Sequence, residues 1–175
     1  MPDLETLVRL FYSSPDQLGR FAEVTAEELP PVYRGLLAHR NHMTVTVEAF
    51  HRSPVDVQVL ETRLADTHYA RKILLRRQSD RRVVQFGIMR IDFSILTPDV
   101  RREIESEQIP LGRVLIQHKV LRKIHLTALW KVSPGSDLQA LFEIPGMTTV
   151  YGRTALIDCN GQPGVELLEI VTPEE

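Results

Sequence analysis

Arg71 is the first residue of the chain whose type and setting suggest chemistry. It shares one side of an extended segment with the apolar residues Tyr69, Ile73 and Leu75. If that side is buried, the guanidinium needs an anion, because an unpaired buried charge is costly. The anion is either a ligand carboxylate or an internal acidic side chain, and an outward-facing strand side would remove the requirement.

Two acidic residues in the last apolar segment form a second candidate. Glu166 and Glu169 interrupt GVELLEIV at 164–171, and their spacing of three places them on opposite faces of a regular strand. One of them is therefore expected to face inward. A buried Glu has a raised pKa and can act as an acid near neutral pH, unless a structural Arg neutralises it.

The third candidate is a stretch of backbone. Leu111 and Gly112 follow Pro110 in the segment IPLGR, which is predicted to be a short loop after a helix. This context suits a backbone N–H that points at a ligand, although an ordinary loop would have the same sequence character.

Other common reaction centres have little support in the sequence. His39 and His42 are three apart, which predicts one shared helix face, but neither has an acidic residue at a zinc-binding spacing, so no metal is expected. Cys159 lies in strand-like sequence, where a buried thiol usually acts as a small apolar side chain. No G-x-S-x-G, G-x-G-x-x-G or P-loop motif is present, so a serine nucleophile and a phosphate loop are not indicated.

The elements that must hold these residues are a helical segment followed by strands. Residues 1–40 have apolar positions at helical spacing and are predicted to be helical. Alternating apolar and polar residues predict strands at 55–63, 69–77 and 83–93, with polar breaks short enough for hairpins. Short connections favour antiparallel neighbours, because parallel strands need long crossovers.

The second half of the chain contains one helix and three more predicted strands. The helix is expected at 97–108, with Thr97 as its N-cap. Strands are expected at 119–132, 150–159 and 164–171, and Asn160–Gly161 is a two-residue hairpin signal. The predicted fold class is α+β, with a single antiparallel sheet of about six strands and covering helices.

Composition indicates one globular domain over residues 1–175. Hydrophobic residues make up 43% and charged residues 25% of the 175 positions. The 21 basic and 23 acidic residues leave a charge of −2, so no nucleic-acid partner is expected. No apolar stretch approaches the length of a membrane helix and no secretory signal is recognisable, which predicts a cytoplasmic protein without a membrane partner.

Five ordered motifs resemble the chorismate pyruvate-lyase (4-hydroxybenzoate synthase) family. In chain order they are HMTVTVEAF at 42–50, YARKILL at 69–75, PLGRVL at 110–115, YGRTALIDCNGQP at 151–163 and LEIVTP at 168–173. The resemblance implies a chorismate lyase-like fold and a carbon–oxygen lyase that cleaves chorismate to 4-hydroxybenzoate and pyruvate. It also implies no cofactor and a monomer or weak dimer. The pathway that this resemblance usually implies is ubiquinone biosynthesis, and other uses of the product stay open.

The same resemblance assigns catalytic roles to Arg71 and Glu169. Arg71 corresponds to the Arg that grips the ring carboxylate, and Glu169 to the Glu at the reacting end of the ligand. Glu169 is preferred over Glu166 because its distance to Pro173 matches the family pattern, while Glu166 stays open as the alternative.

Three further substrate contacts follow from the resemblance and from neighbouring strands. Backbone groups of Met43 and Leu111 are expected to contact the ligand. For the second carboxylate of chorismate, Arg90 on the strand next to Arg71 is the first choice and Arg153 the second. A structural role for Arg90 is an equal alternative.

The main alternative is a domain that binds without catalysis. The same fold forms the effector-binding domains of GntR-type transcription regulators, in which a small aromatic acid would be held through Arg71 and not turned over. An enzyme of this fold acting on another chorismate-like acid is a third option. The presence of both Arg71 and Glu169 favours catalysis, because binding alone requires only the Arg.

Overall fold

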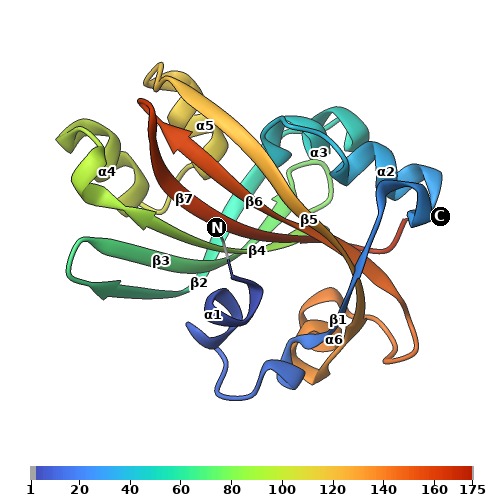
Figure 1. Cartoon of the computed structure of the whole chain (residues 1–175). Helices are drawn as coiled ribbons and strands as arrows, with labels where there is room; N and C mark the ends of the chain where they lie inside the picture. Colours follow the sequence, from blue (N-terminus) through green and yellow to red (C-terminus); the bar gives the residue numbers. More distant parts are fainter. Residues whose placement is uncertain (1–2, 175) are drawn as a thin grey trace.

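A seven-stranded antiparallel sheet forms the centre of the computed structural model, which describes residues 3–174 (Figure 1). The strands are β1 (Gly19–Val24), β2 (Val55–Ala65), β3 (His68–Arg77), β4 (Val83–Asp92), β5 (Arg122–Pro134), β6 (Val150–Cys159) and β7 (Gln162–Val171). Across the sheet their order is β1-β5-β6-β7-β4-β3-β2, and each neighbouring pair is antiparallel. The predicted α+β class with one antiparallel sheet is confirmed.

Within residues 3–174, six short helices connect or cover the strands. They are α1 (Leu4–Arg9), α2 (Pro31–Leu37), α3 (Met43–His51), α4 (Pro98–Glu105), α5 (Leu111–Gln117) and α6 (Ser136–Phe142). Single 3₁₀ turns lie at Pro15–Gln17, Ala26–Glu28 and Phe93–Ile95. Within the described residues, no helix has both the length and the apolar character needed to cross a membrane.

The seventh strand is the main difference from the sequence prediction. Residues 1–40 were expected to be helical, but β1 lies between α1 and α2 and pairs with the end of β5. Gly19 is the only buried residue of β1, so the strand has little of the apolar alternation that identifies strands in a sequence. A Cβ at Gly19 would lie 2.8 Å from the carbonyl oxygen of Ser133, which shows how closely this edge strand approaches its distant partner.

Two local predictions also need correction. The segment IPLGR is not a loop throughout, because α5 begins at Leu111. His39 and His42 do not share a helix face, since both lie between α2 and α3, with His42 as the N-cap of α3. By contrast, Asn160 and Gly161 form the predicted hairpin turn and both have the positive φ angles that such a turn requires.

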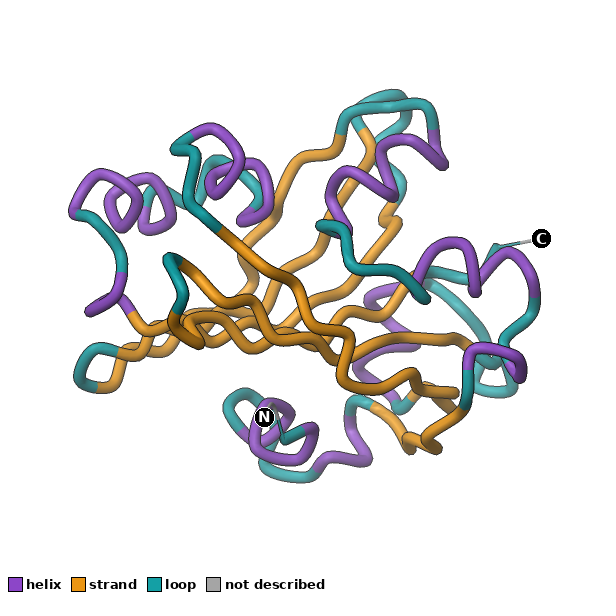
Figure 2. The backbone as a smooth tube through the Cα atoms, turned by 45° about the horizontal axis from the view of Figure 1, so that its top comes forward, coloured by secondary structure: helices purple, strands orange, loops and turns teal. Residues whose placement is uncertain are grey.

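Helices cover the two faces of the sheet unequally. We call the face that carries Arg71 and Leu167 the cavity face; helices α2, α3, α4 and α5 lie over it, whereas α1 lies on the opposite face (Figures 1 and 2). The opposite face buries Leu74, Phe86 and Leu168 against α1 and α6. Alternate residues of each strand therefore enter two separate cores.

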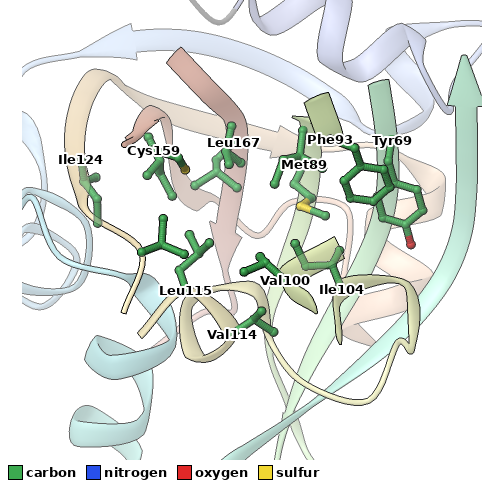
Figure 3. Close-up of a cluster of buried hydrophobic side chains, with 14 of the residues drawn as sticks. Tyr69, Met89, Phe93, Val100, Ile104, Val114, Leu115, Ile124, Cys159 and Leu167 are labelled. Carbon is green, nitrogen blue, oxygen red and sulfur yellow. The ribbon is translucent and has the colours of Figure 1, made fainter. Parts of the chain in front are cut away.

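One cluster fixes α4 and α5 above the cavity face (Figure 3). Val100 and Ile104 of α4 and Leu115 of α5 pack against strand residues such as Met89 and Leu167. Tyr69 and Phe93 stack beside them, with ring centroids 5.1 Å apart. Because these side chains are almost fully buried, the two short helices owe their positions to tertiary packing rather than to their own propensity.

Candidate functional site

A cavity lies between the cavity face and the first residues of α3 and α5. Its lining residues surround about 560 Å³ of empty space, a figure that includes open solvent at its mouth. Strands β3, β4, β6 and β7 form its floor, and the segments beginning at His42 and Pro110 form its roof. The polar side chains that line it are His42, Thr44, Arg71, Gln85, Arg153 and Glu169.

Arg71 is a buried cation that has no acidic partner among the described residues. Its side chain is 1% exposed, and Nη1 donates to the carbonyl oxygen of Ile104 at 3.2 Å. Among residues 3–174, no carboxylate lies within 4.0 Å of its guanidinium and Nε has no hydrogen-bond acceptor. Burial lowers the pKa of Arg71, yet a guanidinium stays protonated in proteins. The predicted placement of Arg71 on a buried apolar face is therefore found, with the anion position open.

Glu169 is the inward-facing acid of β7, and a structural Arg neutralises it. Arg153 Nε donates to Oε1 of Glu169 at 3.0 Å. The other two nitrogens of Arg153 donate to the carbonyl oxygens of His39 and Asn41, each at 2.9 Å. All three donor nitrogens of Arg153 are thus engaged, which leaves this residue poorly suited to hold a second ligand carboxylate.

Gln85 is a cavity residue that the sequence analysis missed. Its Nε2 donates to Oε2 of Glu169 at 3.4 Å, while Oε1 is buried and has no donor within the described part of the chain. The sequence signal that could have identified it is its position in the strand. Gln85 lies on the same side of β4 as Gly87 and Met89, and this row of side chains lies directly beside the β3 row that contains Arg71. A ligand hydroxyl or amide N–H would satisfy this oxygen.

His42 closes the roof of the cavity and is electrically neutral. It is 7% exposed, and in the described structure its Nε2 is buried without a partner. Burial, with smaller contributions from Arg122 and Arg153, lowers the pKa of His42 to about 4. Gly112 leaves room for the ring, since a Cβ at that position would lie 3.0 Å from Cβ of His42.

Met43 and Leu111 occupy corresponding places in the roof. Each is the first residue of its helix, α3 and α5, and each lines the cavity. The first N–H groups of a helix have no acceptor within that helix. The two backbone segments expected to contact a ligand are thus both beside the cavity, and their ligand contacts stay a prediction.

The structure contradicts the choice of Arg90 as the contact for a second ligand carboxylate. It follows Met89 in β4 and therefore points to the opposite face of the sheet. There Nη2 of Arg90 donates to Oε2 of Glu166 at 2.7 Å. The same alternation decides between the two acidic candidates, because Glu166 lies with Arg90 and only Glu169 lines the cavity.

The charges of the cavity leave one cation in excess. Arg153 and Glu169 neutralise each other, His42 is neutral, and Arg71 remains. Apolar side chains form most of the other walls, including Ile73, Met89 and Leu167. Across residues 3–174, no group of three or more His, Cys, Asp and Glu side chains is arranged to hold a metal ion. The arrangement suits a small organic anion.

Comparison with known proteins identifies the fold. No protein-family model and no curated protein sequence matches the chain. Among solved structures, the chain is similar to PhnF from Mycobacterium smegmatis, with a TM-score of 0.58 and 11% identity; the match covers 75% of this chain but only 64% of PhnF. The separate effector domain of PhnF matches with a TM-score of 0.54 and 10% identity, over 75% of this chain and 88% of that domain.

A third match has the same architecture. The ligand-binding domain of a GntR-family transcriptional regulator from Bordetella bronchiseptica matches with a TM-score of 0.51 and 10% identity, over 69% of this chain and 87% of that domain. The chain therefore has the fold of GntR-family effector domains, which is also the fold class of chorismate pyruvate-lyase.

These matches contradict the prediction of a carbon–oxygen lyase. The similar structures are effector and ligand-binding domains of transcription regulators rather than enzymes. The catalytic roles of Arg71 and Glu169 were inferred for that activity, and the two residues are considered below as ligand contacts.

Proposed function

We propose that the chain is a ligand-binding domain that holds a small aromatic acid in the cavity without converting it. The observation that carries this proposal is the buried guanidinium of Arg71, which has an unsatisfied Nε and, in the described structure, no acidic neighbour within 4.0 Å. A ligand carboxylate would supply the missing anion and could form a paired hydrogen bond with the guanidinium.

The end of the ligand opposite its carboxylate would face hydrogen-bond acceptors of the protein. Oε1 of Gln85 has no donor, and Oε2 of Glu169 has only the 3.4 Å contact from Gln85, within the described residues. A ligand hydroxyl would donate to one of these oxygens. The apolar walls formed by Ile73, Met89 and Leu167 would contact the ring between the two polar ends. Backbone N–H groups near Met43 and Leu111 would add contacts from the roof.

Calorimetric titration with 4-hydroxybenzoate and 4-hydroxybenzamide tests the proposal. The two molecules have nearly the same shape, and only the acid carries a charge. We expect the acid to bind the unmodified protein at least about tenfold more tightly, because hydrogen bonds to charged groups contribute about 1.5–3 kcal/mol. Equal binding of acid and amide would overturn the assignment of Arg71 as the carboxylate contact.

Matched variants complete the experiment. Arg71→Met should abolish binding of the acid, whereas Arg90→Met, on the opposite face of the sheet, should leave it unchanged. Chorismate incubated with the protein should yield no 4-hydroxybenzoate above the rate in buffer. Binding that survives Arg71→Met, or that is lost equally in both variants, would contradict the proposal.

A further inference from the structure

A second depression lies directly outside the cavity, where α3 begins close to the start of β5. It is an open depression, and the space above its lining residues, open solvent included, is about 1390 Å³. His42 and Ile124 line both this depression and the cavity, so these two side chains form a wall between the two spaces. We call the outer space the vestibule and define its charged rim by Arg40, Lys119, Arg122 and Lys123.

The vestibule carries uncompensated positive charge. All four rim residues are exposed, and no Asp or Glu is among the described residues that line it. None of the ion pairs found between residues 3 and 174 includes any of the four. Asp158 lies opposite Lys123 in the register of β5 and β6 but does not line the vestibule, so the four cations still outnumber the acids beside them and attract an anionic group.

The walls between these cations are apolar. Val45, Ile116 and Leu121 line the vestibule and are 48%, 38% and 73% exposed. They are half of the six large apolar side chains that the described surface exposes. Exposed apolar side chains gathered in one depression and rimmed by polar ones indicate a binding surface. A ligand that lies here would combine an apolar stem with a charged end.

His42 separates the vestibule from Arg71. Its ring is buried at the boundary, and in the described structure Nε2 has no partner there. A ligand that passes His42 could satisfy this nitrogen with an ether or hydroxyl oxygen. Only the side chains of His42 and Ile124 are shared by the two linings, and a molecule that displaces the His42 ring would reach both spaces, which favours one elongated ligand over a protein or membrane that touches only the surface.

We propose that the ligand is dianionic and elongated, with one carboxylate at Arg71 and a second anionic group in the vestibule beyond His42. This inference rests on the proposed function and specifies its ligand class. The inner group lies in a buried site, whereas the outer group lies among exposed cations. The outer contact is therefore weaker and more sensitive to salt than the inner one.

A series of 4-alkoxybenzoates tests the inference. Each benzoate carries an alkoxy chain of three to eight carbons that ends either in methyl or in carboxylate, and binding is measured by calorimetry at low and high salt. At one best chain length, we expect the carboxylate-ended member to bind about fivefold more tightly than its methyl-ended partner. This gain should shrink at high salt, while binding of the methyl-ended compound changes little.

Variants assign the gain to the vestibule. The double substitution Arg40→Gln with Arg122→Gln should reduce the gain to less than twofold, and Lys131→Gln, which removes an exposed β5 cation outside the vestibule, should preserve it. A gain that survives the double substitution would overturn the inference, as would equal binding of the two series at every length. Arg71→Met should abolish binding of both series.

The outcomes separate the two proposals. If methyl-ended benzoates bind through Arg71 but the terminal carboxylate adds nothing, the dianionic ligand is wrong and the proposed function stands. If no benzoate binds at all, both are wrong. Vesicles of phosphatidylserine and phosphatidylcholine should not bind the protein; binding that depends on Arg40 and Arg122, without a gain in the benzoate series, would assign the vestibule to lipid headgroups and overturn the inference.

Discussion

Arg153 and Glu169 face each other across β6 and β7, with Nε of Arg153 3.0 Å from Oε1 of Glu169. Both side chains are buried in the cavity face, at 0% and 7% exposure. Because this pair is neutral as a unit, the acid of the cavity cannot also neutralise Arg71. The free positive charge of the cavity therefore lies at Arg71, and the two buried arginines have different roles.

The first prediction contrasts the stabilities of variants at these two arginines. Arg153→Met removes the partner of a buried carboxylate and two bonds to the carbonyls of His39 and Asn41. We expect the free energy of unfolding to fall by about 3–5 kcal/mol. Arg71→Met removes a buried cation that has no acid beside it within the described residues, and should raise the free energy of unfolding by about 1 kcal/mol.

Urea unfolding followed by circular dichroism measures both effects. Arg90→Met provides the comparison for loss of a partly exposed pair, since Arg90 and Glu166 form an ion pair on the opposite face. Arg90→Met should lower the free energy of unfolding by at most about 1 kcal/mol. A large loss of stability in Arg71→Met would mean that the bond from Arg71 to Ile104 has a structural role, and would weaken the case for a ligand site.

His42 gives a prediction about pH. The pKa of His42 is about 4 in the folded chain, mainly because of burial, against about 6.5 in the unfolded chain. Between these values the unfolded chain binds the extra proton, so stability rises with pH in this window. The contribution of His42 to the free energy of unfolding is present above about pH 6.5 and is lost as the pH falls toward 4. The loss is roughly 3 kcal/mol at most.

Urea unfolding at pH 7 and pH 4.5 checks this sign. His42→Gln retains a neutral polar side chain and should lose less stability between the two pH values than the unmodified chain. Other groups titrate in the same range, so the difference between the two proteins is the quantity to compare. Equal losses would show that the imidazole is not the group that resists protonation.

The sequence was most informative where side-chain alternation is regular. Period-two spacing placed Arg71 on one side of its strand with apolar residues, without deciding whether that side is buried, and the opposite directions of Glu166 and Glu169 follow from their separation of three. Which face points toward the helices is a property of packing, so it could not be read from one strand. This is why Arg90 was assigned to the cavity although it lies behind it.

Long-range pairing explains the other failures. The edge strand β1 has one buried residue and pairs with β5 more than 100 positions away, so local pattern could not identify it. The partner of Glu169 is Arg153, whose remaining nitrogens reach the loop between α2 and α3. Gln85 was missed because a single polar residue in a strand resembles an outward-facing one. The lyase prediction was wrong because one fold serves both binding and catalysis.

The last prediction concerns the roof of the cavity. Arg113 of α5 forms an ion pair with Glu48 of α3, and the same oxygen of Glu48 accepts a hydrogen bond from the backbone N–H of Val55 at 2.8 Å. The pair therefore connects the two helices whose first residues, Met43 and Leu111, lie over the ligand space. Both side chains are partly exposed, so the pair contributes at most about 1 kcal/mol to stability.

Arg113→Met should act mainly on the motion of the roof. We expect faster hydrogen exchange in residues 111–117 and a higher dissociation rate for 4-hydroxybenzoate, with the free energy of unfolding lowered by about 1 kcal/mol or less. Arg102→Met, which breaks an exposed pair with Asp99 within α4 and leaves the bond between α3 and α5 intact, serves as the control. Unchanged exchange and dissociation in Arg113→Met would show that core packing of Val114 and Leu115 alone holds α5 in place.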